Sequence, residues 1–176
     1  MERTHTAPSG KERTFPADEL IVSKTDPKGR LTYVNDVFLS VSGFTEAELM
    51  GQPHSIIRHP DMPRCVFKLL WDAISSGKEL FAYVNNMAKN GDNYWVFAHV
   101  TPNLDGAGQI IGYHSNRRVP EPKALETIKP LYRRLLEEEA RHADRKAGLD
   151  ASFAMMLRAV ADAGFDSYGR FIFAIT

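Results

Sequence analysis

The sequence predicts an α+β fold in which short helices cover one face of a five-stranded antiparallel sheet. Three observations lead to this prediction. Two short strand-like stretches flank a Pro-Gly turn within residues 20–35, helical spacings follow within 36–75, and three more strand-like stretches occupy 79–119. Because strands and helices come in separate runs instead of alternating, an antiparallel sheet with its helices grouped on one side is favoured over a parallel sheet.

The first two strands are predicted to form a hairpin. Residues 20–26 (LIVSKTD) are apolar and β-branched, and residues 30–35 (RLTYVN) alternate in character. The intervening Asp-Pro-Lys-Gly sequence is typical of a tight turn, since proline presets φ and glycine tolerates positive φ.

Two short helices are expected next. The stretch DVFLSVSGF has apolar side chains at helical spacing and ends at Gly43. Thr45 and Glu48 have the spacing of a capping box, so a second helix is predicted to start there and to end at Gly51.

A longer helix is predicted over residues 64–75. Pro63 lies where a first helical turn tolerates proline, and Gly77 follows the end of the helix. Its large apolar residues recur at helical spacing: Phe67, Leu70, Trp71 and Ile74.

Three antiparallel strands are predicted over residues 79–87, 93–103 and 110–119. The first two flank an Asn-Gly turn at positions 90–91, which is a strong hairpin signal. The second and third are joined by the turn sequence LDGAGQ.

The chain divides into a flexible N-terminal tail (1–18), a domain (19–119) and a helical C-terminal extension (120–176). A Val-Pro-Glu-Pro sequence marks the second boundary. The extension is expected to begin with an amphipathic helix whose solvated face carries the Glu137–Glu139 run.

Further along the extension, Gly148 reads as a helix stop and Asp150 as the N-cap of a second helix, which ends at Gly164. The last residues, RFIFAIT, are apolar and favour a strand.

Composition excludes several classes of function. The 22 Lys and Arg residues balance 22 Asp and Glu residues, so the basic clustering needed for nucleic-acid binding is absent. No apolar run is long enough for a membrane span, and no secretory signal begins the chain. Cys65 is the single cysteine, which excludes an intramolecular disulfide and favours the reducing cytoplasm.

The most informative segment is GQPHSIIRHPDMP, residues 51–63, which holds four charged or titratable side chains between three prolines. Together with KNGDNYW (89–95) it resembles the FAD-binding PAS domain of bacterial aerotaxis receptors. The resemblance covers about residues 19–119. It implies the PAS fold and a non-enzymatic sensor that detects oxygen or energy status through the redox state of a flavin.

The sequence also departs from this family. It has no transmembrane hairpin, adaptor domain or chemoreceptor coiled coil, so we expect it to signal to a partner protein in trans. Met87 and Ala88 stand where the receptors carry two basic residues. In the related light-sensing LOV domains a reactive cysteine occupies the slot that corresponds to His54, so covalent thiol photochemistry is not expected.

Three residues of the proline-rich segment are candidate cofactor ligands. Arg58 and His59 are cationic donors for a phosphate or a ring carbonyl. Asp61 either accepts a hydrogen bond from a ribityl or ribose hydroxyl, or caps the 64–75 helix.

Three further residues complete the predicted site. The resemblance implies that Asn86 bonds the isoalloxazine ring, provided that strand alternation turns it inward in place of Asn85. Trp71 is a candidate to touch the ring, whereas Trp95 fits core packing better. His54 is either a structural histidine or part of the pocket wall. His54, His59 and Asp61 lack a metal-ligand spacing, so no metal site is expected.

Three alternatives remain open. FMN differs from FAD only in lacking the second phosphate and adenosine. A haem-binding oxygen sensor would use His59 or His54 as axial ligand. In a cofactor-free domain, the PAS fold would only dimerise or dock a partner. The C-terminal helices either carry the signal to a partner or second copy, or simply cover the sheet.

Overall fold

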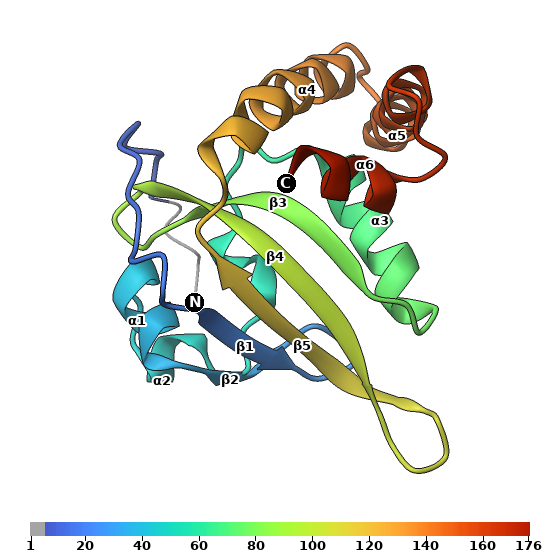
Figure 1. Ribbon diagram of the computed structural model, residues 1–176. Helices are drawn as coiled ribbons and strands as arrows, with labels where there is room; N and C mark the ends of the chain where they lie inside the picture. The colour runs from blue at the N-terminus through green and yellow to red at the C-terminus, as the bar shows by residue number, and fades with distance from the viewer. Residues whose placement is uncertain (1–5) are drawn as a thin grey trace.

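The computed structural model describes residues 6–176 and confirms the predicted α+β architecture (Figure 1). A five-stranded sheet in the order β2-β1-β5-β4-β3 has every neighbouring pair antiparallel. The elements are β1 Ile21–Thr25, β2 Leu31–Val34, α1 Asp36–Ser42, α2 Glu46–Leu49, the 3₁₀ helix η1 His54–Ile57, α3 Arg64–Ser75, β3 Leu80–Met87, β4 Asn93–Leu104, β5 Ile110–Arg118, α4 Pro122–Ala140, α5 Arg145–Asp162 and α6 Tyr168–Ile175.

The short helices begin and end where local chemistry requires it. Gly43, at φ 71°, ends α1 in the left-handed region that glycine occupies without strain. Thr45 and Glu48 form the predicted capping box at the start of α2. The Asn35 side chain accepts from the Phe38 N–H as the N-cap of α1 and also from the Val22 N–H, so it fixes α1 against β1.

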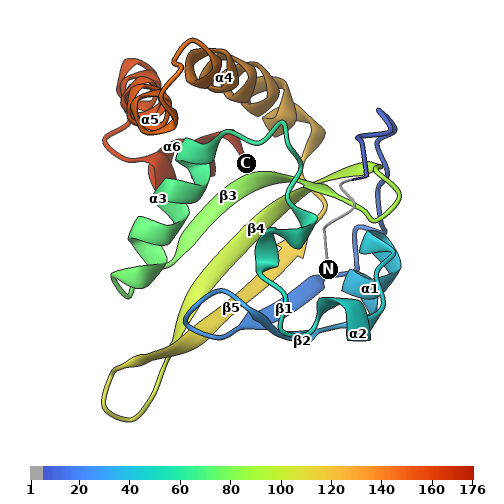
Figure 2. The same cartoon turned by 180° about the vertical axis from the view of Figure 1, so that it is seen from behind.

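Helices lie on both faces of the sheet. Seen from behind, α3 and η1 lie over one face of the sheet, which we call the inner face (Figure 2). On the opposite face, α4 and α6 pack against β3 and β4, whereas no helix lies in front of β1, β2 or β5 in Figure 1. One buried cluster joins α3, β3 and β4 to the C-terminal helices, and a second joins β1 and β2 to α1, α2 and η1.

The segment before β1 packs against the β3–β4 turn. The Ser9 N–H donates to the Gly91 carbonyl, and the backbones of residues 11–13 pair with Asn93. Arg13 forms an ion pair with Asp92, and the side chain of Phe15 is buried. Polar composition alone did not indicate these contacts. Residues 1–5 lie outside the described part of the chain.

The extension contains three helices, and three expectations about it were wrong. The RFIFAIT stretch is helical in α6, because burial of Phe171 and Ile172 at β3 outweighs the strand propensity of this stretch. Asp144, not Asp150, is the N-cap of α5. Gly148 therefore lies inside α5, where a Cβ would stand only 2.8 Å from the Glu139 carbonyl oxygen.

The third wrong expectation concerns the acidic run in α4. Glu137 is exposed, as predicted, but Glu139 is buried and bonded to α3 and α5. The helix itself continues through Pro130.

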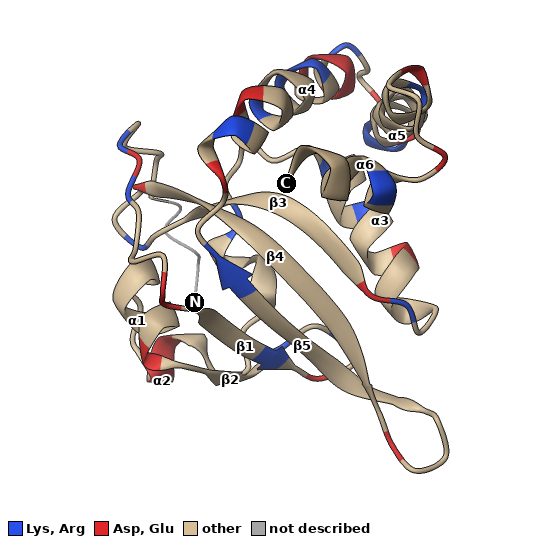
Figure 3. Ribbon diagram, in the orientation of Figure 1, with Lys and Arg blue, Asp and Glu red and all other residues tan. Residues whose placement is uncertain are grey.

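Charges of both signs are spread along α4 and α5, with no large region of one sign (Figure 3). None of the helices within residues 6–176 is both long and apolar enough to span a bilayer.

Candidate functional site

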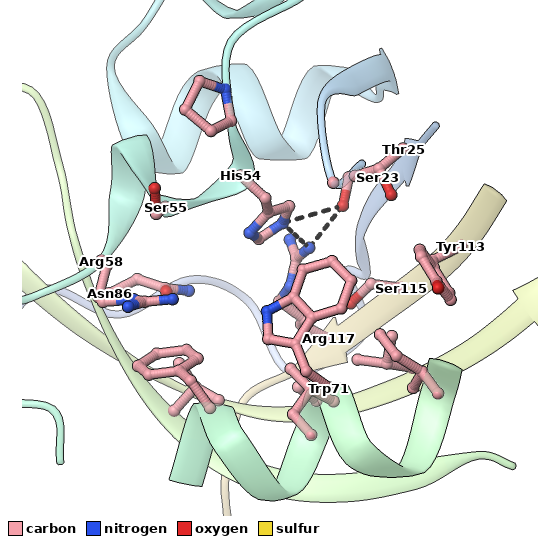
Figure 4. A pocket seen from close by; sticks show the side chains of 18 of the residues that line it. Ser23, Thr25, His54, Ser55, Arg58, Trp71, Asn86, Tyr113, Ser115 and Arg117 are labelled. Atoms are coloured by element: carbon pink, nitrogen blue, oxygen red, sulfur yellow. Dashed lines mark hydrogen bonds between the residues drawn. The ribbon is translucent and has the colours of Figure 1, made fainter. Parts of the chain in front are cut away.

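A cavity of about 200 Å³ lies between the inner face of the sheet, η1 and α3 (Figure 4). Its apolar wall comes mainly from α3 and the central strands, and its polar groups come from β1, β3, β5 and the proline-rich segment. Among its lining residues are Ser23, Lys28, Gly29, His54, Arg58, Phe67, Leu70, Trp71, Ile74, Asn86, Tyr113, Ser115 and Arg117.

The proline-rich segment is held over the sheet by backbone pairing. Pro53 precedes η1, and Arg58 follows it in extended conformation. Arg58 and Asn86 then form an isolated antiparallel bridge, which attaches the segment to β3. The alternation of β3 turns Asn86 into the cavity, whereas Asn85 bonds to Asn93, so the choice between the two amides is resolved.

Four buried polar atoms at this cavity have no hydrogen-bond partner within residues 6–176. In the described part of the chain, the buried side-chain polar atoms without a partner are Arg58 Nε, Asn86 Nδ2, Ser115 Oγ and Arg117 Nη1. All four residues line the same cavity. Because native proteins rarely bury unsatisfied polar groups, this concentration indicates a site built for a polar ligand.

The guanidinium of Arg58 is held against an aromatic ring beside the cavity. Its guanidinium carbon lies 3.6 Å from the centre of the Phe67 ring, so the two planar groups are packed closely. Burial lowers the pKa of Arg58 from its ordinary value. The stacked guanidinium keeps its Nε donor free for an acceptor in the cavity.

Arg117 is the second cation of the site and is almost fully buried on β5. Its Nη2 donates to Ser23 Oγ at 2.5 Å and to His54 Nε2 at 2.6 Å. Its partners here are neutral, and burial lowers the pKa of Arg117 to about 10. A desolvated cation held in this way favours a ligand atom that carries negative charge.

His54 must be neutral in this arrangement. A guanidinium only donates hydrogen bonds, so His54 Nε2 is the acceptor and the proton of the ring lies on Nδ1. Burial, with repulsion from Arg117 and Arg58, holds the pKa of His54 well below its usual value. His54 is therefore part of the pocket wall and orients Arg117.

Two aromatic side chains of the cavity lining contact each other. Trp71 and Tyr113 meet edge to face, with ring centres 5.5 Å apart. A Cβ on Gly29 would lie 2.9 Å from the Trp71 ring, and Gly29 has a φ of 76°, so only glycine fits here without strain. Trp71 remains 37% exposed, which places it at the mouth instead of deep in the core.

The cavity unites four of the six predicted site residues, namely His54, Arg58, Trp71 and Asn86. The other two lie outside its lining. The buried His59 ring accepts from the Asp61 N–H through Nδ1, and the Asp61 side chain is 76% exposed. Asp61 does not cap α3, so that alternative was wrong.

Sequence reasoning missed Arg117 and Ser115. They alternate with outward-facing residues on β5, so the strand pattern of IIGYHSNRR could have indicated that one of the two adjacent arginines points inward. Trp95 packs against Tyr132 and the core, as expected. Within the described chain no group of His, Cys, Asp and Glu could hold a metal.

Acidification is expected to destabilise the protein below about pH 6.5, the ordinary pKa of histidine. The lowered pKa of His54 means that the unfolded chain binds a proton before the folded chain does. Stability is therefore complete above this pH and falls by up to about 1.4 kcal/mol per pH unit below it. Urea unfolding between pH 7.5 and 5 measures the slope.

His54→Gln keeps an acceptor for Arg117 but cannot be protonated, so it should flatten this slope. A residual slope is expected from His59 and His114, whose pKa values burial also lowers. An unchanged slope in the variant would contradict the assignment of a neutral buried His54.

Comparison with known proteins identifies the domain around this cavity. The sequence profile of the PAS fold matches residues 31–117. The chain carries a PAS domain. The match includes the cavity residues from His54 to Arg117, while the C-terminal helices lie beyond it.

The chain is similar to parts of longer curated proteins, among them an aerotaxis receptor. The Aerotaxis receptor of Escherichia coli (strain K12) is 41% identical over 118 residues, which are 67% of this chain and 23% of the receptor. The Nitrogen fixation regulatory protein of Klebsiella pneumoniae is 26% identical over 97 residues, which are 55% of this chain and 20% of that protein. The chain thus spans less than a quarter of either relative.

Solved structures support the same fold. The dark structure of the blue-light photoreceptor Aureochrome1 LOV superposes with a TM-score of 0.56 at 21% identity, over 62% of this chain and 82% of that one. A light-oxygen-voltage domain described with a flavin analogue gives a TM-score of 0.54 at 22% identity, over 63% of this chain and 84% of that chain.

Proposed function

We propose that this PAS domain binds a flavin, FAD in particular, and serves as a redox sensor of oxygen or energy status. The observation that carries the proposal is the set of four unpartnered buried polar atoms in one cavity. Similarity to an aerotaxis receptor and to flavin-related light-oxygen-voltage domains supports the same cofactor class.

The cavity residues fit a flavin ring system. An isoalloxazine needs a flat apolar slot, which Phe67, Leu70 and Ile74 of α3 supply against the sheet. It also needs donors for its carbonyl edge. Asn86 can both donate and accept there, and Arg58 offers a free Nε–H.

When bound, the flavin would supply the electron-accepting chemistry. The chain's own part is electrostatic. Arg117 holds a buried positive charge at the cavity and has an unpartnered N–H there. A fixed positive charge favours the form of a ligand that carries more negative charge, so this site would favour a reduced, anionic ring.

Haem fits these residues less well. An axial histidine needs a free ring nitrogen facing an apolar cavity. His54 Nε2 already accepts from Arg117, and His59 does not line the cavity. The cofactor-free alternative leaves the four buried polar atoms without an explanation.

The choice of FAD over FMN rests on the resemblance to aerotaxis receptors. The exposed Lys28 also lines the cavity and offers a cation for a phosphate group there.

We infer a non-enzymatic output. A change in ring charge would alter the hydrogen bonds of Arg58, Asn86 and Arg117, and the shift would reach the C-terminal helices and through them a signalling partner or a second copy of the chain. The single buried cysteine suits a reducing cytoplasm.

Purified protein should be yellow, with flavin absorption bands near roughly 370 and 450 nm. Extraction by acid followed by chromatography then distinguishes FAD from FMN. A single Soret-type band would establish haem instead, and a colourless protein that does not take up added FAD would refute the proposal.

A further inference from the structure

Helix α3 lies between the cavity and the C-terminal extension. One side of α3 carries the cavity wall, including Phe67 and Trp71. The other side carries Cys65 and Leu69, which pack in the cluster shared with α4 and α5. A displacement of this helix would therefore change both surfaces at once.

The N-terminus of α3 has no cap of its own. Pro63 precedes the helix and makes no side-chain hydrogen bond to it. Glu139 of α4 takes that role: Oε1 accepts from the Cys65 N–H at 3.2 Å, and Oε2 accepts from Arg64 Nε at 2.8 Å. A carboxylate at this position pairs a free backbone donor and complements the helix dipole.

Helix α5 also takes part in the hydrogen bonds around Glu139 and Arg64. Ser152 Oγ donates to Glu139 Oε1 at 3.0 Å. Arg64 Nη1 donates to the Arg145 carbonyl at 2.8 Å, and Gly148 permits the close approach of α5 to Glu139. The buried carboxylate thus joins α3, α4 and α5, and its removal would leave several donors unpaired.

We propose that Glu139 is a positioning residue for the cavity, through which the C-terminal extension and ligand binding at the PAS domain influence each other. The proposal rests on the proposed flavin binding for the nature of the ligand. Helix α3 suits this role because it contacts both the cavity and the extension, and because Glu139 binds the first turn of α3.

Thermodynamic linkage gives the proposal a measurable form. If Glu139 holds α3 in the orientation that forms the cavity wall, its loss lowers the fraction of binding-competent protein and raises the apparent dissociation constant. Reciprocity then requires that a bound ligand protects α4 and α5 in return.

The test compares Glu139→Gln with Glu137→Gln, an exposed position two residues earlier on the same helix. We expect Glu139→Gln to raise the dissociation constant of added FAD roughly five-fold or more, and Glu137→Gln to leave it unchanged. In hydrogen exchange, FAD should protect α5 in the parent protein and protect it less in Glu139→Gln. Equal affinity and equal protection in both variants would overturn the proposal.

Two further measurements keep the test decisive. Ser152→Ala removes one donor to Glu139 and leaves the other two, so it should raise the dissociation constant of FAD by a smaller factor. This variant provides the test if Glu139→Gln does not fold. Without ligand, amides of α3 between Val66 and Trp71 should exchange faster in the Glu139 variant than in the Glu137 variant. Parent protein that binds no flavin refutes the proposed function alone, whereas unchanged α3 exchange refutes the role of Glu139.

Discussion

Replacing Arg58 with alanine is expected to weaken FAD binding about 100-fold. Hydrogen bonds to charged groups contribute about 1.5–3 kcal/mol each, and each 1.4 kcal/mol changes the dissociation constant tenfold. Arg58 offers such a donor from a site where its guanidinium is fixed against Phe67. Fluorescence titration of FAD into the ligand-free protein measures the effect.

Two matched variants separate charge from geometry. Arg58→Lys keeps the positive charge but loses the planar fork and its packing on Phe67, so it should recover only part of the affinity. Arg118→Ala removes an exposed arginine from β5 and should leave binding unchanged. Thermal unfolding checks that each variant is folded. Arg58→Ala that is folded and retains full FAD affinity would remove Arg58 from the site.

Much of the fold followed from local sequence signals. The capping box at Thr45, the Gly43 stop and the Asn-Gly turn each act over a few residues, so they could be read directly and were confirmed. Most of the wrong expectations about the fold lie in the extension, where tertiary burial decides. Nothing local marks Glu139 as buried, because its partners on α3 are 74 and 75 residues away in the chain and its partner on α5 is 13 residues away.

In the site too, residues with a local sequence signal were predicted and residues placed by tertiary structure were missed. Residues in the proline-rich segment were found because charged side chains between prolines are unusual, and Asn86 was found by resemblance. Arg117 was missed because it stands beside a second arginine in a strand, where only the register with β1 and β4 shows which of the two faces the cavity. His59 and Asp61 were predicted to belong to the site because they lie close to Arg58 in the sequence. Unlike Arg58, they do not line the cavity.

Replacing Arg117 with methionine is expected to separate binding from stability. Burial without a carboxylate lowers the pKa of Arg117 from its ordinary value to about 10. This shift corresponds to a cost of roughly 3 kcal/mol for keeping the charge in the folded protein. Methionine fills similar space without that cost, so the ligand-free variant should be at least as stable as the parent in urea unfolding.

The same variant should bind FAD at least about tenfold more weakly, because the charged donor facing the cavity is gone. It should also reduce the loss of stability on acidification, since repulsion from Arg117 is the second cause, after burial, of the low pKa of His54. A natural sequence retains a destabilising buried cation when function requires it. If Arg117→Met instead lowers stability by more than about 1 kcal/mol and leaves FAD affinity unchanged, Arg117 serves the fold through Ser23 and His54, and the cavity owes its ligand preference to Arg58 and Asn86.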